Sequence, residues 1–528
     1  MLTIGLYGAV DPLGLQRSHD HSVAVMRDGK VLFCCELERV TGIKHDGRLD
    51  QYVESILQPW LNSEEDIQWV LVNNFMSDQF SSAGGNVIFE NNGNLPVEHI
   101  FRKLTDKQYV LTHEMGHIAA CLPFYGNFKA NSLLIHIDGG ASNSCASAWY
   151  FDGQKIQHLD HAWHPELKVA VNNFNANPLS AKILNIELKD HLSMPGKLMG
   201  YASFGKYSKI LHQSLIDNHW YVEEAESVDI CGSRGPDIAC CMQRELEEQV
   251  LSYINKFKIQ TGATSLYYAG GAALNIHANV RVERELEFES VFIPPAPSDC
   301  GLALGAAAFF DWKNGKEIKI HSAYLNSSIP ESKTMATLSN SSGGICVVTD
   351  IDQVVTLIAE GEVVAVFAEN GELGPRALGH RSLLIRPDSI LLRKQLSEVM
   401  KQREWYRPVA PIMLTSTAEL ALMEYSKKSH LSRFMLGAWK VKKDWQQHFV
   451  GCIHADDTVR AQVVADTELE TAHIHQLLIQ LRDQHEIQGV INTSFNSRGV
   501  PIVGTFEQAI TQSKKLGVKF LWRPPLTE

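Results

Sequence analysis

The sequence lacks the features of several large classes of protein. No apolar run approaches the roughly 18–20 residues that a membrane-spanning helix needs. The first ten residues contain no lysine or arginine, so we expect a buried strand there and not a signal peptide. The 10 cysteines include no CxxC pair, which indicates reduced, mostly buried thiols. We therefore expect a soluble, cytoplasmic protein with no membrane partner.

Long runs of lysine and arginine are also missing, and the net charge is -12. An enzyme that acts on tRNA or DNA can be acidic overall, but it then needs a basic stripe. We therefore expect no nucleic-acid partner, and any anionic substrate must be held by a few local positive groups. The 528 residues, of which 45% are hydrophobic, predict an ordinary globular protein of two to four domains.

Two similar units of strands occur in the first part of the chain. Residues 3–9 form an apolar run, and an Asp-Gly pair between apolar runs follows within 22–36, a pattern typical of a hairpin. The second unit repeats this order with an apolar run at 132–137 and an Asp-Gly hairpin within 146–159. The repetition predicts an N-terminal duplicated α/β domain of the actin-like (ASKHA) ATPase type.

The composition changes between residues 322 and 347, where Ser, Asn and Gly cluster as in a linker. A second α/β unit follows, beginning with an apolar strand at 363–368. We place the boundary near 335, so that residues 1–335 form the first domain and residues 336–528 form the second.

His113 and His117 are four residues apart, so they lie on one face of a helix and can share a metal. The spacing matches the HExxH pattern of zinc proteases, in which Glu114 would be the general base. Such a protease needs a third ligand downstream, but the next glutamate is Glu166, beyond a predicted strand and hairpin. We therefore reject a protease; two helix histidines without a metal remain the simpler alternative for this motif alone.

Two aspartates could complete a metal site. Asp138 ends a predicted strand, and the glycines Gly139 and Gly140 after it can bring backbone N–H groups close to a ligand. In isolation this segment is equally well a hairpin turn. Asp299 precedes an Ala-rich helix, where it could act only as an N-cap. Two histidines and two aspartates form a donor set suited to Fe(II), Mn or Zn.

A further segment places paired glycines between a strand and a helix, as in many nucleotide sites; it carries Gly270, Gly271 and Asn275.

The strongest pattern lies in the second domain, where basic residues recur in segments rich in Gly, Pro and Asn. Arginine forks and a lysine near a helix end suit substrates that carry phosphate. A lone arginine is usually just solvated, but a Gly-Pro-Arg segment flanked by glycines is harder to explain as surface. The residues concerned are Arg376, Lys401, Arg407 and Arg460, with Ser494 and Asn496 in a later polar loop.

Taken together, these motifs resemble the O-carbamoyltransferase family of the nodulation, cephamycin and tobramycin carbamoyltransferases. The resemblance extends over nearly the whole chain, and the order of the motifs agrees. It includes His19–Ser22, Glu36–Arg39, His113–His117, Met194–Gly200, Gly270–Asn275, Gly374–Gly379, Lys401–Pro408 and Thr493–Asn496.

The resemblance implies a transferase that works in two steps. A C-terminal YrdC-like α/β domain would form carbamoyl-adenylate from carbamoyl phosphate and ATP. The N-terminal domain would then transfer the carbamoyl group to a hydroxyl of a small molecule, such as an antibiotic or another natural product. ATP, with Mg, would be the co-substrate. The resemblance favours Fe(II) as the bound metal, although Zn or Mn fit the ligands too, and a homodimer is the default expectation.

The resemblance also implies roles for individual residues. The metal ligands would be His113, His117, Asp138 and Asp299. The residues at the reacting centres would be His19, Arg376 and Lys401. Nucleotide and phosphate binding would fall to Gly139, Gly140, Gly270, Gly271, Asn275, Arg407, Arg460, Ser494 and Asn496. The alternative that we keep open is a fused threonylcarbamoyl enzyme of tRNA modification, against which the net charge speaks.

Overall fold

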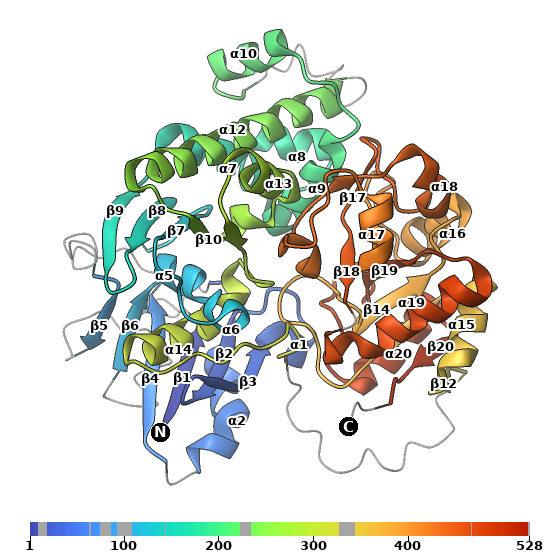
Figure 1. Ribbon diagram of the computed structural model, residues 1–528, viewed down its shortest axis with the longest axis horizontal. Coiled ribbons are helices and arrows are strands. Elements are labelled where there is room, and N and C mark those ends of the chain that lie inside the picture. Colours follow the sequence, from blue (N-terminus) through green and yellow to red (C-terminus); the bar gives the residue numbers. More distant parts are fainter. Residues whose placement is uncertain are drawn as a thin grey trace.

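A computed structural model of the chain describes residues 1–8, 18–62, 65–73, 86–91, 108–142, 144–221, 234–326, 344–465 and 467–525. Two lobes lie side by side in Figure 1, the first coloured blue to yellow-green and the second orange to red. The predicted domain boundary at 335 falls outside the described residues. Among the helices described, none has both the length and the apolar character needed to cross a membrane.

The first lobe begins with a six-stranded sheet in the order β3-β2-β1-β4-β6-β5. Its central strand β1 is antiparallel to β2 and parallel to β4, while β6 continues the parallel side. The edge strand β5 is antiparallel to β6. The strands are β1 (Leu2–Tyr7), β2 (Ser22–Arg27), β3 (Lys30–Glu36), β4 (Ile67–Asn73), β5 (Ile88–Asn91) and β6 (Gln108–Thr112).

A second sheet of the first lobe repeats this arrangement in the order β11-β10-β7-β8-β9. A central strand again has an antiparallel hairpin on one side and parallel strands on the other. The sheet comprises β7 (Ser132–Ile137), β8 (Ala146–Phe151), β9 (Ile156–Ala162), β10 (Ser265–Ala269) and β11 (Ser290–Phe292). This shared topology confirms the predicted duplicated, actin-like α/β architecture.

Small residues let two helices approach closely at the centre of the first lobe. A Cβ on Gly305 of α14 (Leu302–Lys313) would lie 1.9 Å from the carbonyl oxygen of Gly116 in α5 (His113–Ala119). Only glycine fits there, so the Ala-rich composition of α14 reflects this packing. The other helices of the lobe are α1 (Leu37–Thr41), α2 (Leu49–Leu61), α6 (Leu122–Tyr125), α7 (Pro165–Asn175), α8 (Pro178–Leu184), α9 (Met194–Ala202), α10 (Lys209–Asp217), α12 (Gly235–Thr261) and α13 (Ile276–Glu285).

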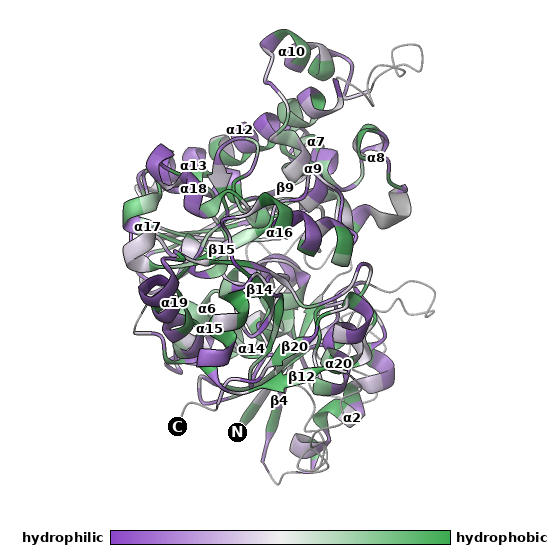
Figure 2. Ribbon diagram, turned by 90° about the vertical axis from the view of Figure 1, so that its right-hand side faces the viewer, coloured by the Kyte–Doolittle hydropathy of each residue, from purple (hydrophilic) through white to green (hydrophobic). Residues whose placement is uncertain are grey.

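The second lobe is built on a mixed seven-stranded sheet in the order β12-β20-β13-β14-β19-β15-β18. Figure 2 shows hydrophobic strands such as β14 and β20 inside and the hydrophilic helix α19 outside. The strands are β12 (Cys346–Val348), β13 (Val364–Phe367), β14 (Arg381–Ile385), β15 (Ala410–Leu414), β18 (Gln462–Val464), β19 (Val490–Ser494) and β20 (Phe520–Trp522), with a small pair β16 (Trp439–Lys440) and β17 (Thr458–Val459). The helices are α15 (Ile351–Ala359), α16 (Ile390–Lys394), α17 (Thr415–Ala421), α18 (Gln446–Phe449), α19 (Ala472–His485) and α20 (Phe506–Leu516). The predicted α/β class of this lobe is confirmed.

Candidate functional site

Four side chains from three parts of the first lobe meet in one buried cluster. His113 and His117 lie one turn apart on α5, and their Nε2 atoms are 2.9 Å apart. Both Nε2 atoms lie 3.5 Å from Oδ1 of Asp299, which stands in a short 3₁₀ turn before α14. Oδ2 of Asp138, which directly follows β7, lies 3.7 Å from Nε2 of His117. The structure thus brings together all four residues that the resemblance identified as metal ligands.

The cluster fits a divalent metal ion. Donor atoms bound to one ion at about 2.0–2.2 Å stand about 3.0–3.5 Å apart at neighbouring positions, close to the separations seen here. Burial acts to raise the pKa of Asp299, but His113 and His117 outweigh it and hold the pKa well below its usual value. The Tyr7 hydroxyl donates a hydrogen bond of 2.7 Å to the other oxygen of Asp299, which fixes the carboxylate.

Backbone N–H groups hold the carboxylate of Asp138. The N–H of Gly139 donates to Oδ1 at 2.5 Å, and the N–H of Gly271 donates to Oδ2. Gly270 instead serves close packing, because its φ is +102° and a Cβ would lie 2.2 Å from the carbonyl oxygen of Ile137. Gly271 therefore binds the carboxylate of Asp138, while Gly270 permits close packing against β7.

Asn275 caps a helix. Its side chain accepts a hydrogen bond of 3.0 Å from the N–H of Ala278 at the start of α13, and it exchanges hydrogen bonds of 2.9 Å with Gln243 of α12. An N-cap of this kind contributes about 1 kcal/mol to stability. The structure therefore gives Asn275 a structural task at the wall of the site.

His19 lies at the edge of the metal cluster. Its Nδ1 is 2.9 Å from Oδ2 of Asp20 and 3.8 Å from Oδ2 of Asp299. The other oxygen of Asp20 is 2.7 Å from Nδ1 of His45, so Asp20 is held between two imidazoles. Burial acts to lower the pKa of His19, but Asp20 and Asp299 outweigh it and raise the pKa to about 9. The ring is therefore held in a fixed orientation beside the cluster.

The second lobe supplies a group of cations around Lys401. The ammonium of Lys401 donates to Oδ1 of Asn496 at 2.8 Å and to the backbone carbonyl of Ser494. Arg403 donates a 3.0 Å hydrogen bond to Oγ of Ser494. Among the described residues, no carboxylate lies within ion-pair distance of Lys401 or Arg403. Uncharged oxygens alone therefore hold these two cations.

Three more arginines complete this cationic cluster, which we define as Arg376, Lys401, Arg403, Arg407 and Arg460. Burial, together with Arg407, lowers the pKa of Arg376 to about 10 and that of Arg403 to about 9. The same two causes, burial and neighbouring cations, place the pKa values of Lys401 and Arg460 well below their usual range. Such crowding is costly unless an anion binds, so the cluster has the electrostatics of a phosphate site.

One cavity of about 910 Å³ joins the two clusters. Of the residues predicted from the sequence, those that line the cavity are His19, His113, Asp138, Gly139, Gly140, Gly271, Asn275, Asp299, Arg376, Lys401, Arg407, Arg460, Ser494 and Asn496. His117, which is fully buried, and Gly270 do not line the cavity. A substrate in this cavity can therefore reach the histidines and the cations without leaving the protein.

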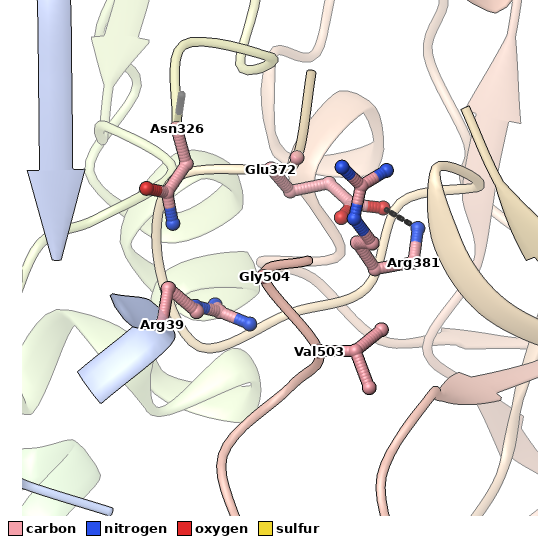
Figure 3. Close-up of a pocket in the computed structure, with 7 residues that line it drawn as sticks. Arg39, Asn326, Glu372, Arg381, Val503 and Gly504 are labelled. Carbon is pink, nitrogen blue, oxygen red and sulfur yellow. Dashed lines mark hydrogen bonds between the residues drawn. The ribbon is translucent and has the colours of Figure 1, made fainter. Parts of the chain in front are cut away.

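The loop that carries Arg376 is held by the first lobe. The N–H of Gly374 donates to Oε1 of Glu36 at 2.5 Å, and Arg39 donates to the carbonyl oxygen of Gly374 at 2.7 Å. Figure 3 shows Arg39 close to Gly504 of the second lobe, where a Cβ on Gly504 would lie 2.2 Å from the Arg39 carbonyl oxygen. The two lobes thus meet at the loop that carries Arg376.

The sequence places Arg403, Glu36 and Arg39 in motifs of the resemblance but assigned them no role, and it did not predict the contact of Glu36 and Arg39 with Gly374. Arg403 lies two residues after Lys401, so the basic character of that segment could have identified it. Nothing in the sequence indicates a contact between residues that are more than 300 positions apart.

Relatives with known names span most of the chain. Nodulation protein U of Azorhizobium caulinodans is 25% identical over 542 residues, covering 92% of this chain and 93% of that protein. Nodulation protein NolNO of Sinorhizobium fredii is 24% identical over 564 residues, covering 97% and 80%. A solved structure, component A of the (R)-2-hydroxyglutaryl-CoA dehydratase of Acidaminococcus fermentans, is 16% identical with a TM-score of 0.34, covering 60% of this chain and 100% of that one.

Two family models also match the chain. The model described as carbamoyltransferase N-terminus matches residues 207–308, and the model described as carbamoyltransferase C-terminus matches residues 355–525. Together they cover more than half of the sequence. The chain therefore belongs to the carbamoyltransferase family.

Proposed function

We propose that this carbamoyltransferase activates carbamoyl phosphate with ATP at the cationic cluster and transfers the carbamoyl group to a small-molecule hydroxyl beside His19. The observation that carries the proposal is the single cavity that joins the histidine–aspartate cluster to the cationic cluster. Activation of the carbamoyl group and its transfer are two reactions, and each needs its own site. The carbamoyl group can pass from the first site to the second only if both open into one cavity. We further propose that residues 1–335 form the transfer domain and residues 336–528 the YrdC-like activation domain.

Activation is proposed because carbamoyl phosphate is a weak electrophile, since its nitrogen donates electrons into the carbonyl. Water would cleave the O–P bond of carbamoyl phosphate, which releases phosphate and leaves carbamate with both of its carbon-bound oxygens. A carbamate oxygen would then attack the α-phosphorus of ATP, which forms carbamoyl-adenylate and releases pyrophosphate. Two highly charged anions must approach each other in this step. The cluster contains five cations and few carboxylates to pair with them. These cations would neutralise the phosphates and stabilise the negative charge of the transition state.

Transfer is proposed to occur at the first lobe. The acceptor hydroxyl would attack the carbamoyl carbon, and the bond to the adenylate oxygen would break, which releases AMP. Asp20 engages Nδ1 of His19, and a metal ion held by Asp299 would offset the carboxylate charge that raises the pKa of this ring. Nε2 of the neutral ring is therefore the nitrogen proposed to take the hydroxyl proton. His113, His117, Asp138 and Asp299 would hold a divalent metal, Fe(II), Zn or Mn, that supplies Lewis acidity for the carbamoyl oxygen or the AMP phosphate.

Passage of the intermediate through the cavity follows from its chemistry. A mixed anhydride of carbamate and AMP reacts readily with water, so an enzyme gains by keeping it enclosed. The cavity offers such a route, because Arg376 and His113 both line it. We infer that the acceptor is a hydroxyl-bearing natural product that enters the same cavity.

The proposal is tested by supplying the purified protein with carbamoyl phosphate and ATP in the absence of an acceptor. We expect phosphate, pyrophosphate and AMP or carbamoyl-adenylate by mass spectrometry, only when carbamoyl phosphate is present, and no ATP consumption by Arg376→Ala. Consumption of ATP with bicarbonate and threonine in place of carbamoyl phosphate would contradict the proposal and favour tRNA modification.

A further inference from the structure

His136 is a buried histidine that the proposed reaction does not use. It lies in β7 two residues before Asp138, and side chains two residues apart on a strand share one face. Its side chain is fully buried, and neither ring nitrogen has a hydrogen-bond partner among the described residues. A buried polar group without a partner destabilises the folded protein, so the burial of this ring needs an explanation.

The ring of His136 lies against the metal cluster. Its centroid is 5.3 Å from that of His117, with 21° between the ring planes. Donor atoms of His117, His136 and Asp138 all lie within 4.8 Å of one another, and the same holds for His113, His117 and Asp299. The two triads share His117, which links the five residues in one connected cluster.

We propose that His136 is a fifth protein ligand of the metal. This inference rests on the metal centre of the proposed function and extends it from two imidazoles to three. A set of three imidazoles and two carboxylates favours an ion that takes five or six ligands, such as Fe(II) or Mn(II), over the four-coordinate geometry typical of Zn. A bond to the metal also gives a partner to one nitrogen of a ring that otherwise has none.

The direct test uses the full chain loaded with Co(II) alone. X-ray absorption fine structure counts the imidazoles bound to cobalt, and we expect three. A count of two would overturn this inference and leave the metal centre standing. If the wild-type chain bound no cobalt, both the metal centre and this inference would fail.

Variants give a second readout. In His136→Gln we expect cobalt affinity to fall at least about 10-fold and the visible absorption of Co(II) to change, whereas His212→Gln should change neither. His212 is a matched control because its ring is held by Glu245 at 2.9 Å, outside the cavity. If His136→Gln does not fold, His136→Cys replaces it: a sulfur-to-cobalt charge-transfer band in the near ultraviolet is expected. Wild-type affinity and spectrum in His136→Gln, or no such band in His136→Cys, would refute the assignment.

Discussion

Replacing Arg376 with glutamine should make the ligand-free protein more stable. Burial and Arg407 lower the pKa of Arg376 from 12.5 to about 10, and its Nε has no partner among the described residues. Because the pKa is lower in the folded than in the unfolded chain, the protonated guanidinium opposes folding below pH 10. This opposition fades as the pH rises from about 10 to 12.5.

The magnitude follows from the same numbers. At about 1.4 kcal/mol for each pH unit, the opposition amounts to about 3 kcal/mol. Water in the cavity screens the charge and reduces it, so we expect Arg376→Gln to gain about 1–2 kcal/mol at pH 7. A phosphate in the cavity reverses the balance, because a hydrogen bond to a charged group contributes about 1.5–3 kcal/mol. We therefore expect pyrophosphate to bind the folded wild-type protein. A ligand that binds only the folded state stabilises it by about 2.7 kcal/mol when it is present at 100 times its Kd.

The assay is chemical unfolding with and without pyrophosphate. The control is Arg386→Gln, since Arg386 pairs with Asp388 at 2.7 Å and lies outside the cavity. We expect the control to lose a little stability and to keep the response to pyrophosphate, while Arg376→Gln gains stability and loses most of the response. An Arg376→Gln protein that is less stable than the wild type and still responds fully would refute this reasoning.

Three further predictions test other parts of the account. Arg39→Lys keeps the charge but loses the fork that bonds Gly374, so carbamoyl phosphate-dependent ATP consumption should fall about 10-fold; an unchanged kcat would contradict the role of the contact. Gly374→Ala should cost about 1–3 kcal/mol in urea unfolding, because φ is +98° and a Cβ would lie 2.4 Å from the Pro295 carbonyl oxygen; Gly196→Ala, with nothing within 4 Å, should cost less than about 1 kcal/mol. His113→Gln should lower metal affinity at least about 10-fold in mass-spectrometric metal analysis, and full retention of metal would argue against the cluster as a metal site.

Local sequence patterns predicted much of the fold. Asp28 and Gly29 form the tight turn between β2 and β3, as the Asp-Gly pair predicted. Glycine suits this turn because it accepts a positive φ, which is +77° at Gly29. The spacing of His113 and His117 placed both rings on one face of α5 because the helical period is 3.6 residues. Such information is contained within a few neighbouring residues.

Other features depend on contacts that no short segment contains. Ser494 was expected in a loop, but it ends β19 because it pairs with Ser382 of β14 across the sheet. The four proposed metal ligands come from separate segments, so their convergence could be inferred only from the resemblance and not from spacing.

The central claim is that the carbamoyl group passes through an adenylate. We would supply the protein with carbamoyl phosphate whose carbon-bound oxygens are ¹⁸O and with unlabelled ATP, and measure the AMP by mass spectrometry. Formation of carbamoyl-adenylate followed by cleavage at the carbonyl carbon leaves one ¹⁸O in AMP, and this is the result we predict. Unlabelled AMP, or carbamoyl transfer without any AMP, would contradict the account.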